Sequence, residues 1–547
     1  IGITVCIGLP IRKDGSLYNC AMVLSDQKIS GIYAKQFLAN DGVHYEPRWF
    51  TAWTQGELHK LVVDGEEANF GDVTININGI NIGFEICEDA WRSDRPANRL
   101  IDKNIQLILN PSASHFAMGK TDQRQNLVID SSRKFNCAYL YINLLGNEAG
   151  RMIYDGEVLI ASKGKWLGYN GNLSYQDYNL IIGSVDFESW EGEFITPPET
   201  FNINEEFAQA TSLGLFDYLR KSRNKGFVVS LSGGADSSCC AILVSEMVRR
   251  GLHELGPEEF VERIGRHDLL SDIPSLNENK LPLFFVSQIL TCVYQGTKNS
   301  SRETLDSAIA VAESIGATFY KWEIDGEVKS YTEKIEKALN RSLTWDQDDV
   351  ALQNIQARAR SPVVWMLANI KNAILLTTSN RSEGDLGYAT MDGDTSGSLA
   401  PIAAVDKHFI LNWLRWAEKS LSYDALNNVN KLDPSAELRP PEKGQTDEKD
   451  LMPYRVIVEI EKLAIREHMS PLQVYMELRE KDIEHEDLLK QHVTKFFRLW
   501  SFNQWKRERT APAFHLDDFN VDPRTWCRFP ILTHAFKEEL RELEELD

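Results

Sequence analysis

A glycine-rich turn between an apolar run and a helix-like segment is the feature that most constrains the fold. The string 227-FVVSLSGGADSS-238 predicts a short buried strand, a turn and the first turn of a helix. Glycines let a backbone approach an anion closely, and a helix N-terminus adds N–H donors and a positive dipole. The GxxxxGK[ST] pattern of a Walker A loop is absent. An ordinary strand-to-helix turn is the alternative, but Asp236 could hold a metal on phosphates, which favours a phosphate-binding loop.

The segments around this turn alternate between helix and strand patterns. The predicted elements are a helix at 210–224, a strand at 226–232, a helix at 237–250, a strand at 281–288, a helix at 301–316 and a strand at 317–324. Repeated βαβ units predict a Rossmann-like, doubly wound parallel sheet with helices on both faces. The proline-rich, charged stretch 434–453 predicts a mobile segment.

The first third of the chain has a different pattern, in which short β-like runs alternate with polar turns. Strands are predicted at 3–10, 73–87, 105–112 and 138–145, with a helix at 121–136. This pattern indicates an α/β layered domain. We therefore expect a first domain at 1–195, a linker at 196–207 and a second domain at 208–547.

Composition narrows the class of function. A formal charge of -21 disfavours a general nucleic-acid or membrane-surface binder, because both need a basic footprint. Eight irregularly spaced cysteines without a CxxC pair predict a reduced, intracellular and cytoplasmic protein without a cysteine zinc site. No signal peptide or membrane-spanning run is visible. Since the chain starts within a strand-like run and without Met, we expect that it lacks an N-terminal segment.

The glycine turn and four later strings resemble a known family. SGGADS matches the SGGxDS loop of the N-type ATP pyrophosphatases, which activate a carboxylate or carbonyl by adenylation. Four strings resemble, in order, segments of NAD synthetases: 353-QNIQARAR-360, 374-ILLTTSNRSEGDLGYATMDGDTSG-397, 401-PIAAVDK-407 and 505-WKRERTAP-512. The resemblance covers about residues 206–530. It implies ATP-dependent amidation of deamido-NAD through an acyl-adenylate, with Mg²⁺ as cofactor.

The resemblance also implies roles for individual residues. ATP would contact Ser232, Gly233, Gly234, Ala235, Asp236, Ser237 and Thr378. Deamido-NAD would be bordered by Asn354, Arg358, Glu383, Tyr388, Thr390, Asp394, Lys407 and Lys506, with the two lysines at phosphates or the activated carboxylate. Asp236 and Glu383 would hold Mg²⁺ together with phosphate oxygens, which is how this ion prefers to bind. Metal and lysine clamps suit the charge that adenylation places on phosphoryl oxygens.

A single cysteine in 81-NIGFEICEDAW-91 raises the question of a nucleophile. A lone cysteine at the end of a strand is most often a buried structural residue. A thiol on a turn, however, can lie beside backbone N–H groups that stabilise a reacting oxygen, and the N–H of Glu88 is the candidate here. The C-E-D-x-W string and the lysine in 31-GIYAKQFLANDGVHYEPRWFTAW-53 together resemble the nitrilase-type glutaminase domains of glutamine-dependent NAD synthetases.

This second resemblance implies a nitrilase-like α-β-β-α sandwich and a Glu–Lys–Cys triad. Cys87 matches the nucleophile and Lys35 the lysine, whose charge would lower the pKa of the thiol and stabilise an oxyanion. Glu46 matches a glutamate that supports the lysine, with a surface carboxylate as the alternative. Ser114 and Lys120 match residues that hold the backbone of glutamine.

Two features depart from the family pattern. Asp41 stands where many bacterial relatives carry a glutamine-contacting tyrosine, and Lys120 stands where some carry arginine. The catalytic glutamate of the family precedes the lysine, but the 34 residues before Lys35 contain no Glu, and neither Asp14 nor Asp26 matches its motif. We therefore expect the base to lie in a segment that precedes this chain.

The leading hypothesis is a two-domain amidotransferase that releases ammonia from glutamine and uses it to make NAD⁺, acting on small molecules as a homo-oligomer, without nucleic-acid or membrane partners. A first alternative is an ammonia-dependent synthetase whose nitrilase-like domain is a non-catalytic scaffold. A second is another ATP-pyrophosphatase amidotransferase, such as a GMP-forming enzyme. That enzyme uses a G-x-C-x-G nucleophile string, and no such string surrounds Cys87.

Overall fold

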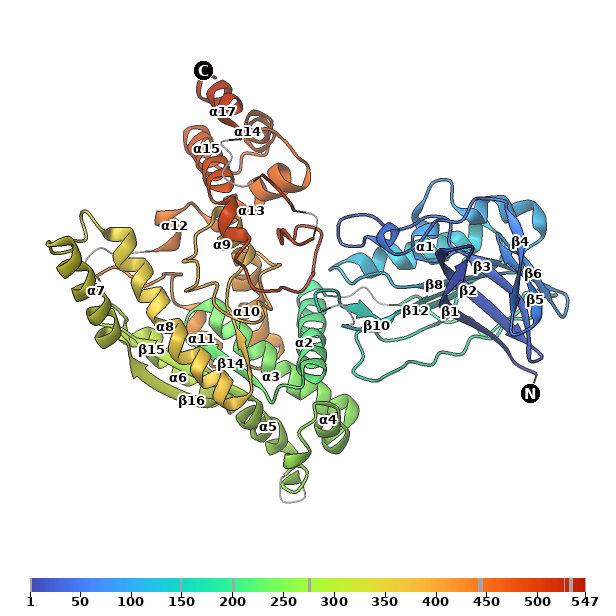
Figure 1. Ribbon diagram of the computed structural model, residues 1–547, viewed down its shortest axis with the longest axis horizontal. Helices are drawn as coiled ribbons and strands as arrows, with labels where there is room; N and C mark the ends of the chain where they lie inside the picture. The colour runs from blue at the N-terminus through green and yellow to red at the C-terminus, as the bar shows by residue number, and fades with distance from the viewer. Residues whose placement is uncertain are drawn as a thin grey trace. The chain divides into compact units, whose positions relative to one another are not determined.

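The structure is a computed structural model that describes residues 2–147, 150–198, 202–273, 277–440, 446–525, 527–530 and 535–546 (Figure 1). The chain forms two compact units, residues 1–148 with 153–203, and residues 149–152 with 204–547. Helix α2 (Ile203–Ser222) begins inside the predicted linker, of which residues 199–201 lie outside the described residues. Within these ranges, no helix combines the length and apolarity needed to cross a lipid bilayer.

The first unit contains two sheets. One has the order β1(Thr4–Lys13), β2(Ser16–Ser25), β3(Lys28–Ala34), β5(Glu66–Gly71), β4(Leu58–Val63). The other has the order β13(Lys165–Tyr169), β12(Val158–Ser162), β9(Ala138–Asn143), β8(Leu107–Ser112), β7(Ile80–Phe84), β6(Ile75–Ile77). Strands β7, β8 and β9 are parallel, so the residues that follow them lie at one edge of the sheet. Cys87 and Ser114 both follow strands at that edge.

The two sheets pack face to face, and a helix covers the second sheet. Val23 and Tyr33 of the first sheet share a buried cluster with Ile82 and Phe84 of the second. On the other face of the second sheet, Val128 of helix α1 (Lys120–Lys134) packs among buried strand residues. Burial of these apolar side chains from water stabilises the layers. The arrangement is that of a nitrilase-like sandwich, as predicted.

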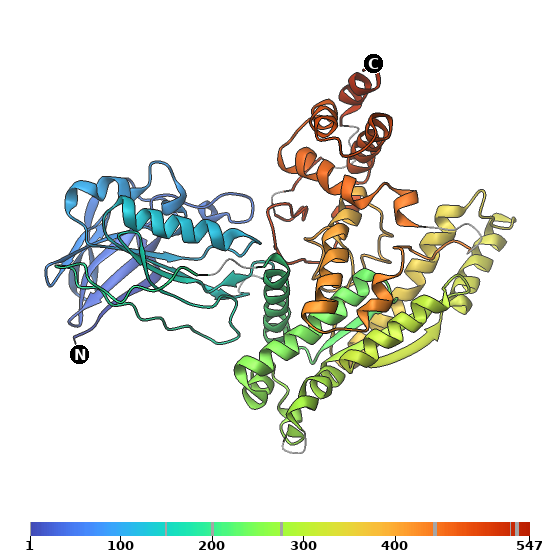
Figure 2. The same ribbon diagram turned by 180° about the vertical axis from the view of Figure 1, so that it is seen from behind.

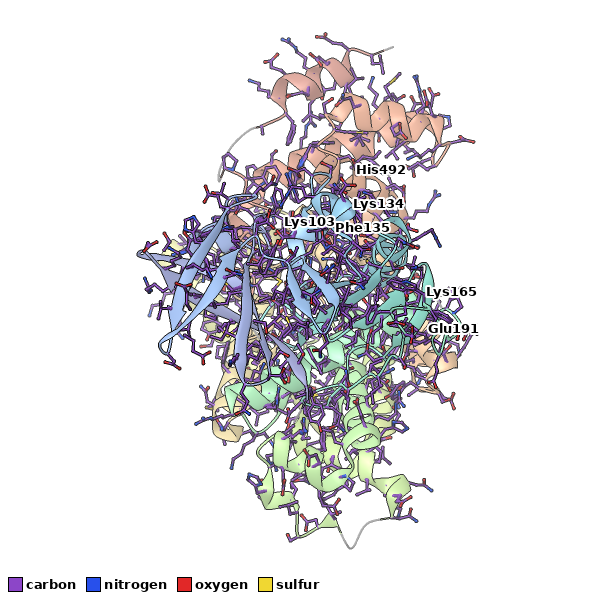
Figure 3. All side chains as sticks on the ribbon, turned by 90° about the vertical axis from the view of Figure 1, so that its right-hand side faces the viewer. Lys103, Lys134, Phe135, Lys165, Glu191 and His492 are labelled. Atoms are coloured by element: carbon purple, nitrogen blue, oxygen red, sulfur yellow. The ribbon has the colours of Figure 1, made fainter. Side chains whose placement is uncertain are left out.

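A buried ionic network connects the end of α1 to the strand before Cys87. Lys134 and Phe135 lie at this end, with the lysine Nζ 5.1 Å from the ring centroid (Figure 3). The guanidinium carbon of Arg95 lies 5.2 Å from the same ring. Arg95 Nε donates to Glu85 Oε1 at 2.9 Å, and the Tyr139 hydroxyl donates to Glu85 Oε2 at 2.8 Å. Because both ions are paired and hydrogen-bonded, the network can stay buried and hold Glu85 in place.

The second unit is built on a parallel sheet with helices on both faces, as predicted. Its order is β16(Thr318–Glu323), β15(Leu290–Gly296), β14(Phe227–Ser230), β17(Ile374–Leu376) (Figure 2). Val228 and Leu375 pack against Val364 of helix α8 (Asp349–Lys371). Val229 and Cys292 point to the opposite face and are also fully buried. Both faces of the sheet are therefore covered, as parallel sheets require.

Two strand predictions are wrong in detail. Residues 281–288 form most of helix α5 (Leu281–Ile289), and the strand begins only at Leu290. Pro282 is at home in the first turn of a helix, while the fully buried residues after 289 include β-branched and aromatic side chains that suit a strand. The segment 73–87 is a hairpin of β6 and β7 rather than one strand. Asn78 and Gly79, both with positive φ, form its turn.

The stretch 434–453 was predicted to be mobile, yet part of it is ordered. Residues 441–445 lie outside the described residues, but Asp447–Asp450 form the short helix α12. Asp447 and Met452 are buried. Proline content and charge predicted a mobile segment, but they did not reveal the helix or the burial of these residues.

Two candidate active sites

The nucleophile candidate lies on a strained turn. Strand β7 ends at Phe84, three residues earlier than predicted, and Cys87 begins the short 3-10 helix η2 (Cys87–Trp91). Cys87 has φ 49°, a left-handed conformation that costs a non-glycine residue about 1–2 kcal/mol. Its N–H donates to Asn110 Oδ1 at 3.2 Å. The Asp89 N–H donates to the Ile86 carbonyl at 3.1 Å. Of the N–H groups at the start of η2, that of Glu88 is therefore the one suited to stabilising an oxyanion.

Lys35 and Glu46 form the ionic pair of this site. Lys35 follows β3 and is only 2% exposed, and its Nζ lies 2.5 Å from Glu46 Oε2. Glu46 also accepts hydrogen bonds from the Ala39 N–H at 2.7 Å and from Asn19 Nδ2 at 3.0 Å. These contacts fix the carboxylate against the lysine, so Glu46 is not an ordinary surface carboxylate.

Asp89 joins the lysine segment to the cysteine turn, a function that sequence reasoning missed. Its fully buried carboxylate accepts four hydrogen bonds from both segments. The donors are the N–H groups of Gln36 (3.1 Å), Phe37 (2.8 Å) and Ile86 (2.9 Å), and the Tyr33 hydroxyl (2.9 Å). Burial raises the pKa of Asp89 to about 7, while these bonds lower it. Asp89 is part of the C-E-D-x-W string, but the string does not reveal its partners.

Burial and the charge of Lys35 act in opposite directions on the pKa of the Cys87 thiol. Burial raises the pKa of Cys87 above its ordinary value, although Lys35 and a backbone hydrogen bond from Ala113 lower it. The prediction that the Lys35 charge lowers the pKa of the thiol is confirmed, but desolvation by burial has the larger effect and raises it.

Polar groups at the same edge of the sheet include both residues predicted to hold glutamine. The buried Ser114 donates its N–H to Asn143 Oδ1 at 2.8 Å and accepts from Asn143 Nδ2 at its carbonyl, also at 2.8 Å. Lys120 Nζ lies 3.3 Å from His115 Nε2. Asp41 is exposed and accepts from the N–H of His44 at 2.7 Å. The side chain of His115 therefore lies in contact with Lys120.

The glycine turn of the second unit has the geometry of an anion-binding loop. Gly233 has φ 84°, and a Cβ at this position would overlap with the Thr304 carbonyl oxygen. Glycine is therefore required here. Helix α3 (Ala235–Leu255) begins directly after Gly234. The hydroxyl oxygens of Ser232 and Ser237 lie 3.0 Å apart, across the mouth of the loop.

Asp236, Glu383 and Lys407 come together as predicted, although they are far apart in the sequence. Asp236 forms an ion pair with Lys407 Nζ and accepts from Asn380 Nδ2 at 3.2 Å. Asn380 also caps helix α9 (Arg381–Leu386) by accepting from the Glu383 N–H at 3.0 Å. Burial, and then the charge of Asp236, raises the pKa of Glu383, while Lys407 lowers it.

Asp447 is a third carboxylate in this cluster, and sequence reasoning missed it. Burial raises the pKa of Asp447. The nearby charge of Lys407 lowers this pKa, and that of Asp236 raises it. Its Oδ2 accepts from the Tyr454 hydroxyl at 3.0 Å, whereas its buried Oδ1 has no hydrogen-bond partner among the described residues. Three carboxylates with one ammonium leave an excess of negative charge that fits a divalent cation.

The residues predicted to border deamido-NAD gather around the loop 387–394. Asn354 accepts from the Thr390 hydroxyl at 2.7 Å, and Asp394 accepts from the Thr390 N–H at 2.7 Å. The exposed Arg358 donates from Nε to the Met391 carbonyl at 3.0 Å.

Two further members of this set support the loop. The Tyr388 hydroxyl donates to Asp450 Oδ2 at 2.9 Å. Lys506 Nζ donates to the carbonyls of Gly387 at 2.7 Å and Ala389 at 3.2 Å, and burial lowers its pKa. In this structure Lys506 holds the loop. Thr378 is half-buried and follows β17, just before Asn380, the residue that bonds to Asp236.

Comparison with known proteins identifies a family for each of the two parts of the chain. The carbon-nitrogen hydrolase family model matches residues 1–192, and the NAD synthase family model matches residues 207–510. A solved glutamine-dependent NAD(+) synthetase from Cytophaga hutchinsonii is 51% identical, with 99% of this chain and 87% of that chain covered and a TM-score of 0.88.

More distant relatives match almost the whole of this chain. The glutamine-dependent NAD(+) synthetase of Arabidopsis thaliana is 28% identical over 94% of this chain and 80% of that protein. The enzyme from Acinetobacter baumannii, solved with ADP, is 21% identical over 97% of this chain and 84% of that chain, with a TM-score of 0.63, and shares the fold. Since both family models match this chain in order, and half of its residues are identical to those of a solved relative, it belongs to the glutamine-dependent NAD(+) synthetase family.

Proposed function

We propose that this chain converts deamido-NAD to NAD⁺, with ATP as the activating substrate and glutamine as the nitrogen donor. The observation that carries the proposal is the presence of two charged clusters, one in each unit, on one chain. One cluster joins a thiol to the Lys35–Glu46 pair, and the other joins the glycine turn to the Asp236–Lys407 pair. Neither cluster alone accounts for a glutamine-dependent ligase.

In the first unit, Cys87 attacks the amide carbon of glutamine. A carbon–sulfur bond forms, the carbon–nitrogen bond breaks, and the proton lost by the thiol ends on the nitrogen, which leaves as ammonia. Water then cleaves the thioester and releases glutamate. The Lys35 ammonium stabilises the thiolate and the oxyanion, and Glu46 keeps that ammonium in place. The N–H of Glu88 in η2 supplies a further donor.

In the second unit, an oxygen of the nicotinate carboxylate attacks the α-phosphorus of ATP, and pyrophosphate leaves. Ammonia then attacks the acyl carbon, forming the amide and releasing AMP. The N–H groups at the start of α3 and the ammonium of Lys407 bind phosphoryl oxygens. Asp236 and Glu383 would hold Mg²⁺, with Asp447 beside them, and the ion would neutralise phosphate charge.

An isotope experiment tests this function. The protein is incubated with deamido-NAD, ATP, Mg²⁺, glutamine labelled with ¹⁵N at the amide and unlabelled ammonium, and the NAD⁺ is analysed by mass spectrometry. We expect labelled NAD⁺, with one AMP, one pyrophosphate and one glutamate for each NAD⁺ formed. Unlabelled NAD⁺ without glutamate would mean that the enzyme uses ammonia and that the first unit is a scaffold.

Three further expectations stay predictions: that Mg²⁺ is the metal, that the chain acts as a homo-oligomer and that it acts in the cytoplasm. Analytical ultracentrifugation of the purified protein would test the second. The acidic cluster of three carboxylates supports the first.

A further inference from the structure

A buried arginine stands at the first position of helix α9, and three carboxylates from three segments share its guanidinium. Arg381 is 4% exposed. Its Nη2 donates to Asp406 Oδ2 at 3.2 Å, its Nη1 donates to Asp517 Oδ2 at 2.6 Å, and its Nε lies 2.5 Å from Glu461 Oε1. The guanidinium carbon also lies 5.6 Å from the centroid of the Phe519 ring. The arginine therefore joins segments that are up to 136 positions apart in the sequence.

Asp406 connects this arginine to the charged cluster of the second unit, because it directly precedes the lysine that begins helix α10 (Lys407–Ser420). The backbones are tied together at the same point. The Arg381 N–H donates to the Val405 carbonyl at 2.9 Å, and the Lys407 N–H donates to the Ser382 hydroxyl at 3.1 Å. One ion pair and two hydrogen bonds therefore hold the start of α9 against the start of α10.

The start of α9 also fixes the carboxylates of the cluster. Asn380, the residue before the arginine, accepts from the Glu383 N–H at 3.0 Å and donates to Asp236 Oδ1 at 3.2 Å. Asp236 in turn forms the ion pair with Lys407. The contacts thus form a closed ring, which runs from the arginine through Asn380 and Asp236 to the lysine and back through the carboxylate that precedes α10. A shift of the guanidinium would move the ammonium relative to Glu383.

The other two carboxylates around the arginine differ in what they lead to. Glu461 ends helix α13 (Tyr454–Glu461), and the hydroxyl of the first residue of this helix donates to Asp447 Oδ2 at 3.0 Å. Asp517, by contrast, lies in the segment 511–522, which carries none of the residues assigned to either site. Two of the three ion pairs of the arginine therefore lead to the charged cluster, and the third does not.

A purely stabilising role is the competing interpretation of this network. Buried ions are costly to desolvate, and well-packed apolar side chains of similar volume often give equal or greater stability. Stability alone therefore does not account for one guanidinium among three carboxylates. A guanidinium does offer a rigid plane of five N–H donors, which fixes the geometry of several partners at once. In this structure, those partners include the residue before Lys407 and the last residue of α13.

We propose that Arg381 is a positioning residue for the adenylation reaction. It holds the starts of α9 and α10 so that the carboxylate of Glu383 and the ammonium of Lys407 meet the same phosphoryl group. The arginine acts through these two residues. This inference rests on the proposed function, because it takes Lys407 as a phosphate-binding residue.

Two asparagine variants give a matched test, because Asp406 and Asp517 are bonded in the same way. In Asp406, Oδ1 accepts from the Phe409 N–H at 2.7 Å and Oδ2 accepts from Arg381. In Asp517, Oδ1 accepts from the Phe519 N–H at 3.0 Å and Oδ2 accepts from Arg381. An asparagine at either position can keep the Oδ1 bond, while its NH₂ group replaces the acceptor of the guanidinium. Each variant removes one ion pair from the same arginine, but only the first adjoins Lys407.

We expect Asp406→Asn to lower the ammonium-dependent kcat about tenfold, because a small displacement of a catalytic group is costly, and Asp517→Asn to leave it within about twofold of the wild type. The KM for ATP should change less than kcat in both. The thermal unfolding midpoint should fall by a similar amount in both, since each loses one ion pair. In a Lys407→Met background, Asp406→Asn should lower kcat no further, because its effect passes through the lysine.

Arg381→Lys tests the arginine directly and does not depend on the folding of Asp406→Asn. It keeps the buried positive charge, but a lysine has no planar fork with which to hold three carboxylates, so we expect the same loss of kcat. Equal kcat values in the two asparagine variants, an unchanged kcat in Arg381→Lys, or a loss that persists in the Lys407→Met background would each overturn the positioning inference. If the wild type formed no NAD⁺ from deamido-NAD, ATP and ammonium, the proposed function would fail, and this inference with it.

Discussion

The two sites contain the same ionic pair, a buried lysine against a carboxylate, but in opposite electrostatic settings. Lys35 meets one carboxylate, Glu46, beside a thiol. Lys407 meets Asp236 within a group of three carboxylates. The first setting suits a reaction that creates negative charge on sulfur and oxygen. The second suits a cation bound together with phosphates. The comparison shows that the surroundings of a Lys–carboxylate pair, rather than the pair itself, decide its chemistry.

Removing each lysine in turn is the strongest way to break this comparison. We expect Lys35→Met to lower glutamine-dependent NAD⁺ formation on the order of 10³-fold and to spare the ammonium-dependent reaction, because it removes transition-state charge stabilisation from one site only. Lys407→Met should lower both reactions by a similar factor. Steady-state rates with each nitrogen source measure this. If Lys35→Met lowered both rates equally, the division of labour between the two sites would be wrong.

The glycine turn has no counterpart at the cysteine site, where strain is borne by Cys87. We expect Gly233→Ala to destabilise the second unit by at least about 2 kcal/mol, because the new Cβ meets the Thr304 carbonyl in a left-handed backbone. Gly234→Ala is the matched control, since its Cβ would lie 3.4 Å from the Ser232 hydroxyl. Urea unfolding measures both, and equal stabilities would contradict the turn geometry.

Asp447 sharpens the comparison because the extra carboxylate of the first site, Asp89, accepts four hydrogen bonds, whereas Asp447 Oδ1 has no partner among the described residues. We expect Asp447→Asn to raise the Mg²⁺ concentration needed for half-maximal activity about tenfold, with either nitrogen source. Glu448→Gln, at an exposed neighbour, should leave it unchanged. Titration of activity with Mg²⁺ is the measurement. An unchanged requirement in Asp447→Asn would make this carboxylate purely structural.

The smallest expected difference is in the pH dependence of stability. Burial, the largest influence, lowers the pKa of His44; Asp41 and Glu46 raise it, while Lys120 and Lys35 lower it. The unfolded chain therefore gains a proton before the folded one as pH falls below about 6.5, and the first unit loses stability.

The pKa of Asp447 is raised, so the folded state keeps its proton longer and the second unit loses stability as pH rises above about 4. Thermal unfolding at pH 4–8 without metal measures both trends. We expect His44→Gln to flatten the pH dependence of stability in the first unit and Asp447→Asn to flatten that in the second. Parallel trends in both units would contradict these assignments.

Residues within contiguous strings could be predicted from the sequence, and their distant partners could not. Cys87, Lys35 and the glycine turn stand in strings whose local pattern already indicates strand, turn and helix. The bonds from Asp89 to Gln36 and Phe37 join residues more than 50 positions apart. Asp447 reaches its cluster from a loop that carries no regular pattern.

The sign of the Cys87 pKa shift could not be predicted for the same reason. The sequence shows the lysine that lowers the pKa, whereas the burial that raises it arises from the packing of two sheets. The strand prediction at 281–288 was wrong for a local reason. The apolar run around Pro282, in the N-terminal turn of α5, fits a strand as well as a helix.

The central claim is that Cys87 releases, from glutamine, the ammonia that the Asp236 site uses. The direct measurement is the rate of NAD⁺ formation by Cys87→Ala with glutamine and, separately, with ammonium. We expect no detectable glutamine-dependent rate and an ammonium-dependent rate within about twofold of the wild type. Glutamine-dependent synthesis that survives the substitution would contradict the claim, and loss of both rates would make Cys87 a structural residue.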